Sequence, residues 1–127
     1  MLGYITIGAN NLPRSERFYT AVLAPLGYAK AEEADGVAYT RPDGAIYVKK
    51  PFDGREATVG NGSMIAFRVP THAELRALHS AGIAAGGTDE GAPGFRAQYS
   101  SNFFVGYLRD PLGNKLALFC TAMERAA

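Results

Sequence analysis

The sequence predicts an α+β fold built from two βαβββ modules, and three observations carry that prediction. A half-buried strand, an amphipathic helix and three short strands follow one another between Leu2 and Lys50. A polar segment that contains glycine, residues 51–62, then separates this series from the rest of the chain. The same order of elements starts again at Ser63, so the chain contains an internal repeat. Two similar halves predict a shared core in a chain of 127 residues.

The first half has clear signals for the start and end of its helix. Asn10 and Asn11 offer an N-cap, and Pro13 fits the first helical turn. Pro25 and Gly27 end the helix. The predicted strands of this half are 2–8, 28–33, 37–41 and 45–50, with turns at 34–36 and 42–44.

The second half repeats this pattern with a longer connection after its helix. Thr71 and Glu74 form a capping box, and Leu75, Leu78 and Gly82 give the helix a buried face. The expected strands are 63–69, 103–109 and 115–121, with a loop at 86–94, a further strand near 95–99 and a turn at 110–114. We expect the core to contain Ile5, Ile7, Phe18, Val22, Leu23, Ile65, Phe67, Leu75, Leu78, Leu116 and Leu118.

Composition excludes several classes of protein. Thirteen Lys and Arg residues against twelve Asp and Glu residues give a net charge of +1, so nucleic acid and membrane surfaces are not expected partners. No apolar run is long enough to cross a bilayer, and no secretory signal opens the chain. The single cysteine, Cys120, excludes an internal disulfide. We therefore expect a cytoplasmic location.

Several segments resemble the vicinal oxygen chelate superfamily, which includes glyoxalase I, bleomycin-resistance proteins and extradiol dioxygenases. The segments NLPRS (11–15), FY (18–19) and VLAPLGY (22–28) resemble its first helix. The segments APGFR (92–96), NFF (102–104) and DPLGN (110–114) resemble the second half of its small bacterial, glyoxalase-like members. The resemblance implies one domain over residues 1–127, with modules at about 1–55 and 60–127 whose sheets curl around a shared cleft. It also implies a homodimer.

Enzymes of this superfamily hold a divalent metal in the cleft, mostly through His and Glu. The resemblance places the four ligand positions on Tyr4, Val48, Met64 and Ala117. A catalytic zinc needs about three nitrogen, oxygen or sulfur ligands from the protein, and this set does not supply them. The sequence therefore predicts no metal and no cofactor.

The remaining candidate residues follow from alternation along the strands. If the four positions above face the cleft, their neighbours two residues away face it too. Three of these neighbours are cations and none is acidic, which predicts a small organic ligand that carries at least one negative charge. Arg96 and Tyr99 either border the cleft entrance or belong to a solvated loop. The cleft positions predicted in addition to the four ligand positions are Thr6, Lys50, Ala66, Arg68, Lys115 and Phe119.

Other residues with reactive side chains have structural interpretations. His72 and His79 lie seven residues apart on the predicted second helix, about 10 Å along its axis, and we expect both to be surface residues. We expect Cys120 to be a small core residue that points away from the cleft. The glycines of 86–94 lack the features of a phosphate-binding loop and predict turns.

Three functions remain open from the sequence. The first is a metal-free member of the glyoxalase and bleomycin-resistance group that binds a small organic molecule. The second is a lyase-type or dioxygenase-type enzyme. It would use a metal whose ligands lie elsewhere, or act without metal through Tyr4, Arg68, Arg96 or Tyr99. The third is a non-catalytic scaffold.

Overall fold

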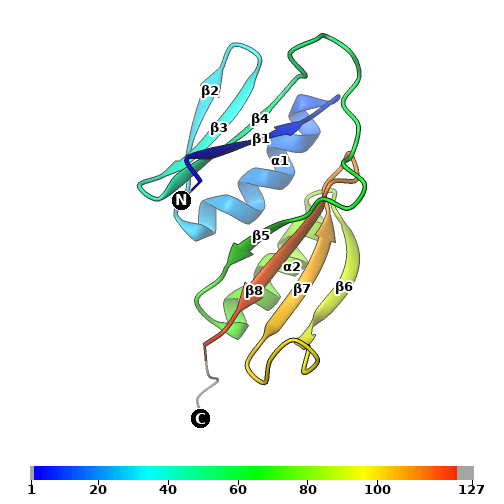
Figure 1. Ribbon diagram of the computed structural model, residues 1–127. Helices are drawn as coiled ribbons and strands as arrows, with labels where there is room; N and C mark the ends of the chain where they lie inside the picture. The colour runs from blue at the N-terminus through cyan, green and yellow to red at the C-terminus, as the bar shows by residue number, and fades with distance from the viewer. Residues whose placement is uncertain (1, 123–127) are drawn as a thin grey trace.

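The first half of the chain folds in the order that the sequence predicts (Figure 1). A computed structural model describes residues 2–122. The elements of this half are β1 (Tyr4–Gly8), α1 (Leu12–Leu23), the short 3₁₀ helix η1 (Ala24–Leu26), β2 (Ala29–Glu33), β3 (Gly36–Arg41) and β4 (Gly44–Lys49).

The second half repeats the series after the connection at 50–64. No helix within residues 2–122 is long and apolar enough to cross a bilayer. The elements of this half are β5 (Ile65–Arg68), α2 (His72–Ala84), β6 (Thr88–Phe95), β7 (Phe104–Arg109) and β8 (Lys115–Cys120).

Each half closes into a mixed sheet of four strands, in the orders β1-β4-β3-β2 and β5-β8-β7-β6. The first strand of each half runs parallel to the last, and the other pairs are antiparallel. A parallel pair needs a crossover connection, and here it includes the helix, which packs on one face of the sheet. Figure 1 shows α1 and α2 on the same side of the two sheets. The predicted α+β fold of two βαβββ modules is confirmed.

Both helices begin where the sequence predicts. The Asn11 side chain accepts a hydrogen bond from the backbone N–H of Arg14, and Thr71 accepts one in the same way from Glu74. These caps satisfy N–H groups that have no partner inside the helix. After η1, Gly27 adopts the left-handed conformation at φ 90°, which ends the helical segment.

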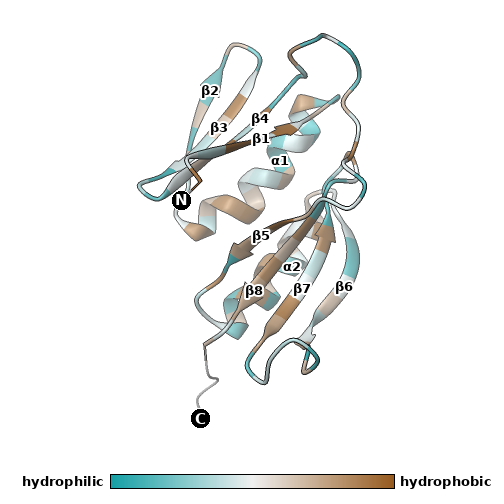
Figure 2. Ribbon diagram, in the orientation of Figure 1, coloured by the Kyte–Doolittle hydropathy of each residue, from teal (hydrophilic) through white to brown (hydrophobic). Residues whose placement is uncertain are grey.

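The core joins residues of both modules. The side chains that α1 buries include Phe18, Tyr19 and Val22, and α2 buries Leu75 and Leu78. Gly82 lies where the helices meet: a Cβ there would come within 2.8 Å of Leu108 and 3.3 Å of Phe18. Nine of the eleven predicted core residues are buried, and Ile5 and Ile65 are half-buried against the same cluster. Figure 2 shows the apolar residues along β1, β5, β7 and β8.

The prediction of a loop at 86–94 is wrong, because most of it forms β6 (Thr88–Phe95). β6 lies at the edge of its sheet and contains Pro93 and two glycines. Its pairing with β7 shifts register twice, between Asp89 and Gly91 and between Gly91 and Gly94. An edge strand tolerates proline and irregular pairing, so residues that usually indicate turns occur inside a strand here.

A buried carboxylate ties the β7–β8 turn of the second module to α1 of the first. Asp110 is 3% exposed. Its Oδ2 accepts hydrogen bonds from the Tyr19 hydroxyl at 2.6 Å and the Asn114 side chain at 2.9 Å. Its Oδ1 accepts three more, from the backbone N–H groups of residues 112–114. Burial and the neighbouring Asp110 charge raise the pKa of Tyr19 well above its ordinary value, so its hydroxyl stays a donor near neutral pH.

Candidate functional site

The face of each sheet that is turned away from the helices, here called its open face, carries most of the predicted cleft residues. Ile7 and Phe67 are buried on the helix side of β1 and β5. Side chains alternate along a strand, so Thr6 and Ala66 belong to the open faces. Both residues are exposed, in agreement with this assignment.

The open face of the first sheet carries Tyr4, Thr6 and Tyr47. Thr6 lies opposite Tyr47 in the β1–β4 register, and the Tyr4 and Tyr47 rings meet edge-on at 5.4 Å. Val48, predicted in the cleft, is instead fully buried among the core residues on the helix side. That prediction is wrong by one residue.

The error comes from the turns that precede β4 and β8. Ile46 pairs with Ile5 in the first sheet, and Leu116 pairs with Ile65 in the second, so these pairs are equivalent. Ile46 comes two residues after the turn glycine, Gly44, but Leu116 comes three residues after Gly113. A shift of one residue moves every side chain of a strand to the other face.

Lys50 is also misplaced by the sequence. β4 ends at Lys49, and Lys50 follows it as an exposed residue whose backbone N–H donates to the Asp35 carbonyl. Lys50 and Thr6 line a separate cavity of about 490 Å³ near the connection between the modules. The cation of the first open face is Lys49, and it forms an ion pair with Asp35 at 3.3 Å.

The open face of the second sheet combines cations with aromatic rings. The Arg68 guanidinium lies 4.7 Å from the centroid of Phe119 and donates to the Thr121 hydroxyl at 2.9 Å. The Lys115 ammonium lies 5.1 Å from the ring centroid of Tyr107. Contacts of this kind stabilise a cation at a desolvated ring face. Ala66 and Ala117 pair in register between these two clusters.

The segment after β6 adds to the same surface. The Arg96 guanidinium donates to the Ala92 carbonyl and lies 5.9 Å from the Tyr107 centroid. Tyr99 meets Phe103 edge-on at 5.7 Å, and Phe103 stacks on Phe119 at 6.0 Å. Arg96 and Tyr99 therefore border the second open face, although Tyr99 remains 67% exposed.

Sequence reasoning missed Tyr47, Phe103 and Tyr107. The register of β7 with β8, which pairs Tyr107 with Ala117, shows that Tyr107 shares the open face. Alternation within residues 103–109 could not reveal this, because apolar and aromatic residues occupy both faces of the strand. We name the set on and beside the second sheet the cation–aromatic surface; it consists of Arg68, Arg96, Tyr99, Phe103, Tyr107, Lys115 and Phe119.

Two cavities lie between the modules. One, of about 590 Å³, brings Tyr4 and Met64 together with Ala66. Val48 and Ala117 do not line it, so the four positions assigned from the resemblance do not form a single cluster. Tyr4 is 67% exposed and Met64 47% exposed, and both are accessible from this cavity.

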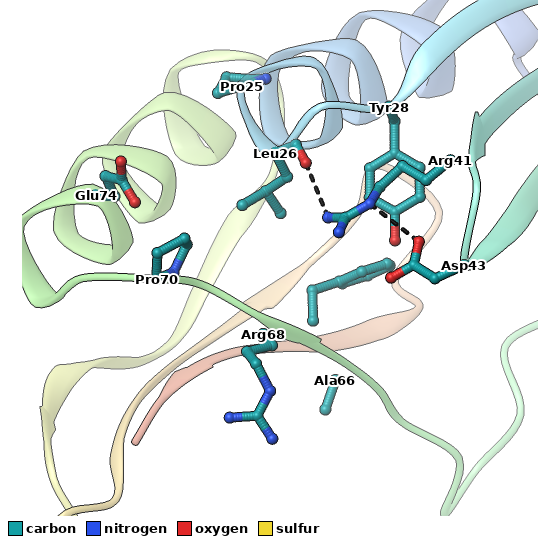
Figure 3. Close-up of a pocket in the computed structure, with 10 residues that line it drawn as sticks. Pro25, Leu26, Tyr28, Arg41, Asp43, Ala66, Arg68, Pro70 and Glu74 are labelled. Carbon is teal, nitrogen blue, oxygen red and sulfur yellow. Dashed lines mark hydrogen bonds and ion pairs between the residues drawn. The ribbon is translucent and has the colours of Figure 1, made fainter. Parts of the chain in front are cut away.

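The second cavity, of about 480 Å³, lies beside β5 and is shown in Figure 3. Arg41 crosses it, donating to the Leu26 carbonyl at 2.9 Å and pairing with Asp43 at 3.1 Å. Arg41 also lies over the ring of Tyr28, whose pKa is raised by burial against the opposing effect of the Arg41 charge. Figure 3 shows the Arg68 guanidinium pointing away from this group. Arg68 also lines this cavity, but its guanidinium lies against Phe119 and the Thr121 hydroxyl.

A divalent metal does not fit the residues present. The equivalent positions, corrected for the register of β4, carry two phenols, a thioether and a methyl group: Tyr4, Tyr47, Met64 and Ala117. Within residues 2–122, no three His, Cys, Asp or Glu side chains are grouped so that they could hold an ion. Zinc and related ions prefer imidazole, thiolate and carboxylate donors.

The prediction that His72 and His79 are surface residues is wrong, because both are buried on the inner side of α2. The His72 ring stacks on Phe104 at 4.2 Å, and its Nε2 is 3.1 Å from the Ala122 carbonyl. His79 Nε2 lies 3.1 Å from the Tyr107 carbonyl and 3.0 Å from an Asp89 carboxylate oxygen. Both histidines lie on the helix side of the second sheet, away from its open face. Cys120 is buried as predicted, with its sulfur 3.5 Å from the Pro70 carbonyl.

Several solved structures are similar to this fold. A glyoxalase/bleomycin resistance protein from Albidiferax ferrireducens T118 shares 37% identity over 94% of this chain and 98% of its own, with a TM-score of 0.86. A glyoxalase-related enzyme from Fulvimarina pelagi shares 21% identity over 94% of this chain and 87% of its own, with a TM-score of 0.76. No family model and no curated protein matches the sequence.

The fold and these similarities define a protein of the vicinal oxygen chelate superfamily. Within it, the chain belongs to the glyoxalase/bleomycin resistance protein family.

Proposed function

We propose that the protein binds a small organic molecule that carries at least one negative charge, without metal chemistry. The observation that carries this proposal is the cation–aromatic surface. It presents Arg68, Arg96 and Lys115 beside four aromatic rings. The strands β5, β7 and β8 contain no Asp or Glu.

The chemistry of this surface suits an aromatic or partly apolar anion. Cations on a surface with apolar walls concentrate counter-ions. Arg68 keeps guanidinium N–H groups beyond the one given to Thr121, and a guanidinium can hold a carboxylate through two parallel hydrogen bonds. The ring of Phe119 and the neighbouring Ala66 offer contacts for an apolar body. Ala66 also borders the cavity that contains Tyr4 and Met64, which provides space for a larger ligand.

A matched set of ligands tests the charge preference. We expect 2-naphthoate to raise the melting temperature, because a ligand that binds only the folded state stabilises it. The neutral 2-naphthamide and the cationic 2-naphthylmethylamine share its ring system and should have smaller effects. Equal shifts for the three compounds, or no shift with any of them, would overturn the proposal.

A homodimer and a single cooperative domain over residues 1–127 are also part of this proposal. Large apolar side chains lie exposed near the connection and the cavity between the modules, among them Leu2, Tyr4, Phe52 and Met64. An exposed apolar surface of this kind is typical of interaction sites. Light scattering should give twice the 13.5 kDa mass of the chain at micromolar concentration, and calorimetry should give one transition. A monomer, or two separate transitions, would contradict these expectations.

A further inference from the structure

A separate cavity at one end of the second sheet has the features of an oxyanion site. It has a volume of about 570 Å³ and is lined by the 59–64 segment together with Arg109 and Lys115. None of the residues that line it is acidic. Arg68 lies at the other end of the open face: it pairs with Phe119, four residues along β8 from Lys115 and thus roughly 13 Å away.

The two cations of this cavity lie directly opposite each other on neighbouring strands. Arg109 pairs with Lys115 in the β7–β8 register. Like charges in this arrangement repel, and the repulsion destabilises the pair of strands. Glu90 offsets the Arg109 charge through an ion pair at 3.1 Å. Lys115 contacts the Tyr107 ring but forms no ion pair within residues 2–122. A bound anion would neutralise the remaining charge.

The Arg109 guanidinium is already oriented. One of its terminal nitrogens donates to the Gly113 carbonyl at 2.9 Å, and the other donates to Glu90. Two anchors on different elements hold its plane and leave three of its five N–H groups available. A donor that is fixed before binding loses little conformational entropy when a ligand arrives.

The 59–64 segment, which lines the cavity, carries further polar groups. Gly60–Ser63 forms a turn in which the Ser63 N–H donates to the Gly60 carbonyl at 2.9 Å, and Gly62 adopts a left-handed φ of 94°. A Cβ on Gly60 would come within 2.8 Å of the Ser63 hydroxyl, so the turn packs this hydroxyl against bare backbone. The backbone N–H groups of Asn61 and Gly62 donate to no other group within residues 2–122.

We propose that the cavity formed by Arg109, Lys115 and the Gly60–Ser63 turn binds a phosphoryl oxyanion, either inorganic phosphate or the phosphate of a monoester. A phosphoryl group offers three acceptor oxygens and nearly two negative charges at neutral pH. These oxygens match an ammonium, a guanidinium, a hydroxyl and two amides better than the two oxygens of a carboxylate do. The inference rests on the proposed ligand-binding function, because Lys115 belongs to both surfaces.

Titration with inorganic phosphate, followed by ¹H–¹⁵N NMR at pH 7.5 and constant ionic strength, tests this site. We expect saturable shifts of the amides of residues 60–63, with a Kd of about 1–10 mM. Lys115→Gln should raise this Kd about tenfold, and Lys115→Arg should largely retain binding. Arg14→Gln removes one exposed positive charge on α1 and should change the Kd less than twofold. The spectrum of each variant reports directly whether it is folded.

Three results separate the possible outcomes. Tighter binding of phenyl phosphate indicates a monoester as the ligand, and equal binding indicates free phosphate. Shifts that do not saturate, or a Kd that Lys115→Gln leaves unchanged, would overturn the oxyanion site. If phosphate fails in this way but 2-naphthoate still stabilises the protein, only this inference is wrong. If both fail, the proposed function is wrong as well.

Discussion

The two modules share one architecture but differ in the chemistry of their open faces. In the first, Tyr4 meets Tyr47, and Lys49 on the same face is paired with Asp35. In the second, Arg68 and Lys115 lie against aromatic rings and pair with no carboxylate within residues 2–122. The repeat therefore specifies the backbone, whereas a few open-face residues specify what each sheet can bind.

The turns that precede β4 and β8 also differ, in the burial and hydrogen bonding of the aspartate that each contains. In the second module, buried Asp110 accepts five hydrogen bonds and reaches Tyr19 in the first module. In the first module, Asp43 is exposed, and within residues 2–122 its one ion pair is with Arg41. A surface ion pair contributes little to stability, whereas a buried and fully bonded carboxylate is costly to remove.

The largest predicted effect follows from this contrast. Asp110→Ala should lower the free energy of unfolding by about 3 kcal/mol or more, because it leaves buried donors without an acceptor. The matched Asp43→Ala should lower it by less than about 1 kcal/mol. Urea unfolding followed by circular dichroism measures both. Similar losses for the two variants would show that the Asp110 network does not hold the modules together.

Sequence reasoning recovered most of the fold because its signals are local. Caps at Asn11 and Thr71 and the alternation of β1 and β5 each depend on a few neighbouring residues. The face of the sheet to which each β4 side chain points could be predicted only by counting residues from the turn glycine. The number of residues between that glycine and the equivalent strand position differs by one between the modules. β6 was missed because bulges let an edge strand carry glycine and proline.

The candidate site was harder to predict than the fold. Alternation predicts Arg68, Lys115 and Phe119 on one face, in agreement with the strand register, whereas Tyr107, the ring beside Lys115, is placed on that face only by the register of the β7–β8 hairpin. The prediction that both histidines are exposed failed because the exposure of a helix residue depends on which face of the helix packs on the sheet. His72 and His79 share that face with Leu75.

A smaller effect is expected at the hydroxyl that joins the modules. Tyr19→Phe should lower the free energy of unfolding by about 1–2 kcal/mol at pH 8, because Asp110 loses one of its donors. The folded pKa of Tyr19 is raised. Its contribution is therefore fully present below the unfolded value of about 10 and is lost as the pH rises above it.

Urea unfolding between pH 8 and pH 11 tests this sign. The difference between the wild type and Tyr19→Phe should shrink above pH 10. Tyr39→Phe is the matched control within the first module, since the Tyr39 hydroxyl bonds to Thr20 and the Glu16 carbonyl. Its pKa is also raised by burial, so it should show the same trend without the link to Asp110. A difference that grows with pH in Tyr19→Phe would contradict the assignment.

The contrast between the open faces predicts a difference in ligand binding. Arg68→Gln should raise the Kd for 2-naphthoate about tenfold, equivalent to about 1.4 kcal/mol. Lys49→Gln removes the same charge from the first open face and should change the Kd less than twofold. Isothermal titration calorimetry measures both values. Equal losses would mean that net charge alone attracts the ligand and that the second sheet has no special role.

The smallest expected effect is that of metal ions. Each module contributes two of the positions at which related enzymes hold a metal, and here these are two tyrosines, a methionine and an alanine: Tyr4, Tyr47, Met64 and Ala117. A lone phenol or thioether does not satisfy zinc, nickel, manganese or iron(II). After treatment with EDTA, each of these ions at tenfold excess should therefore shift the melting temperature by less than about 1 °C, since an ion that does not bind the folded state cannot stabilise it.

Cys120→Ser serves as a control for binding to the thiol. Stoichiometric metal by elemental analysis that is retained in Cys120→Ser and lost in Tyr4→Ala would show that the first open face holds an ion. The metal-free part of the proposed function would then be wrong, whereas the anion preference of the second sheet would stand on its own measurement.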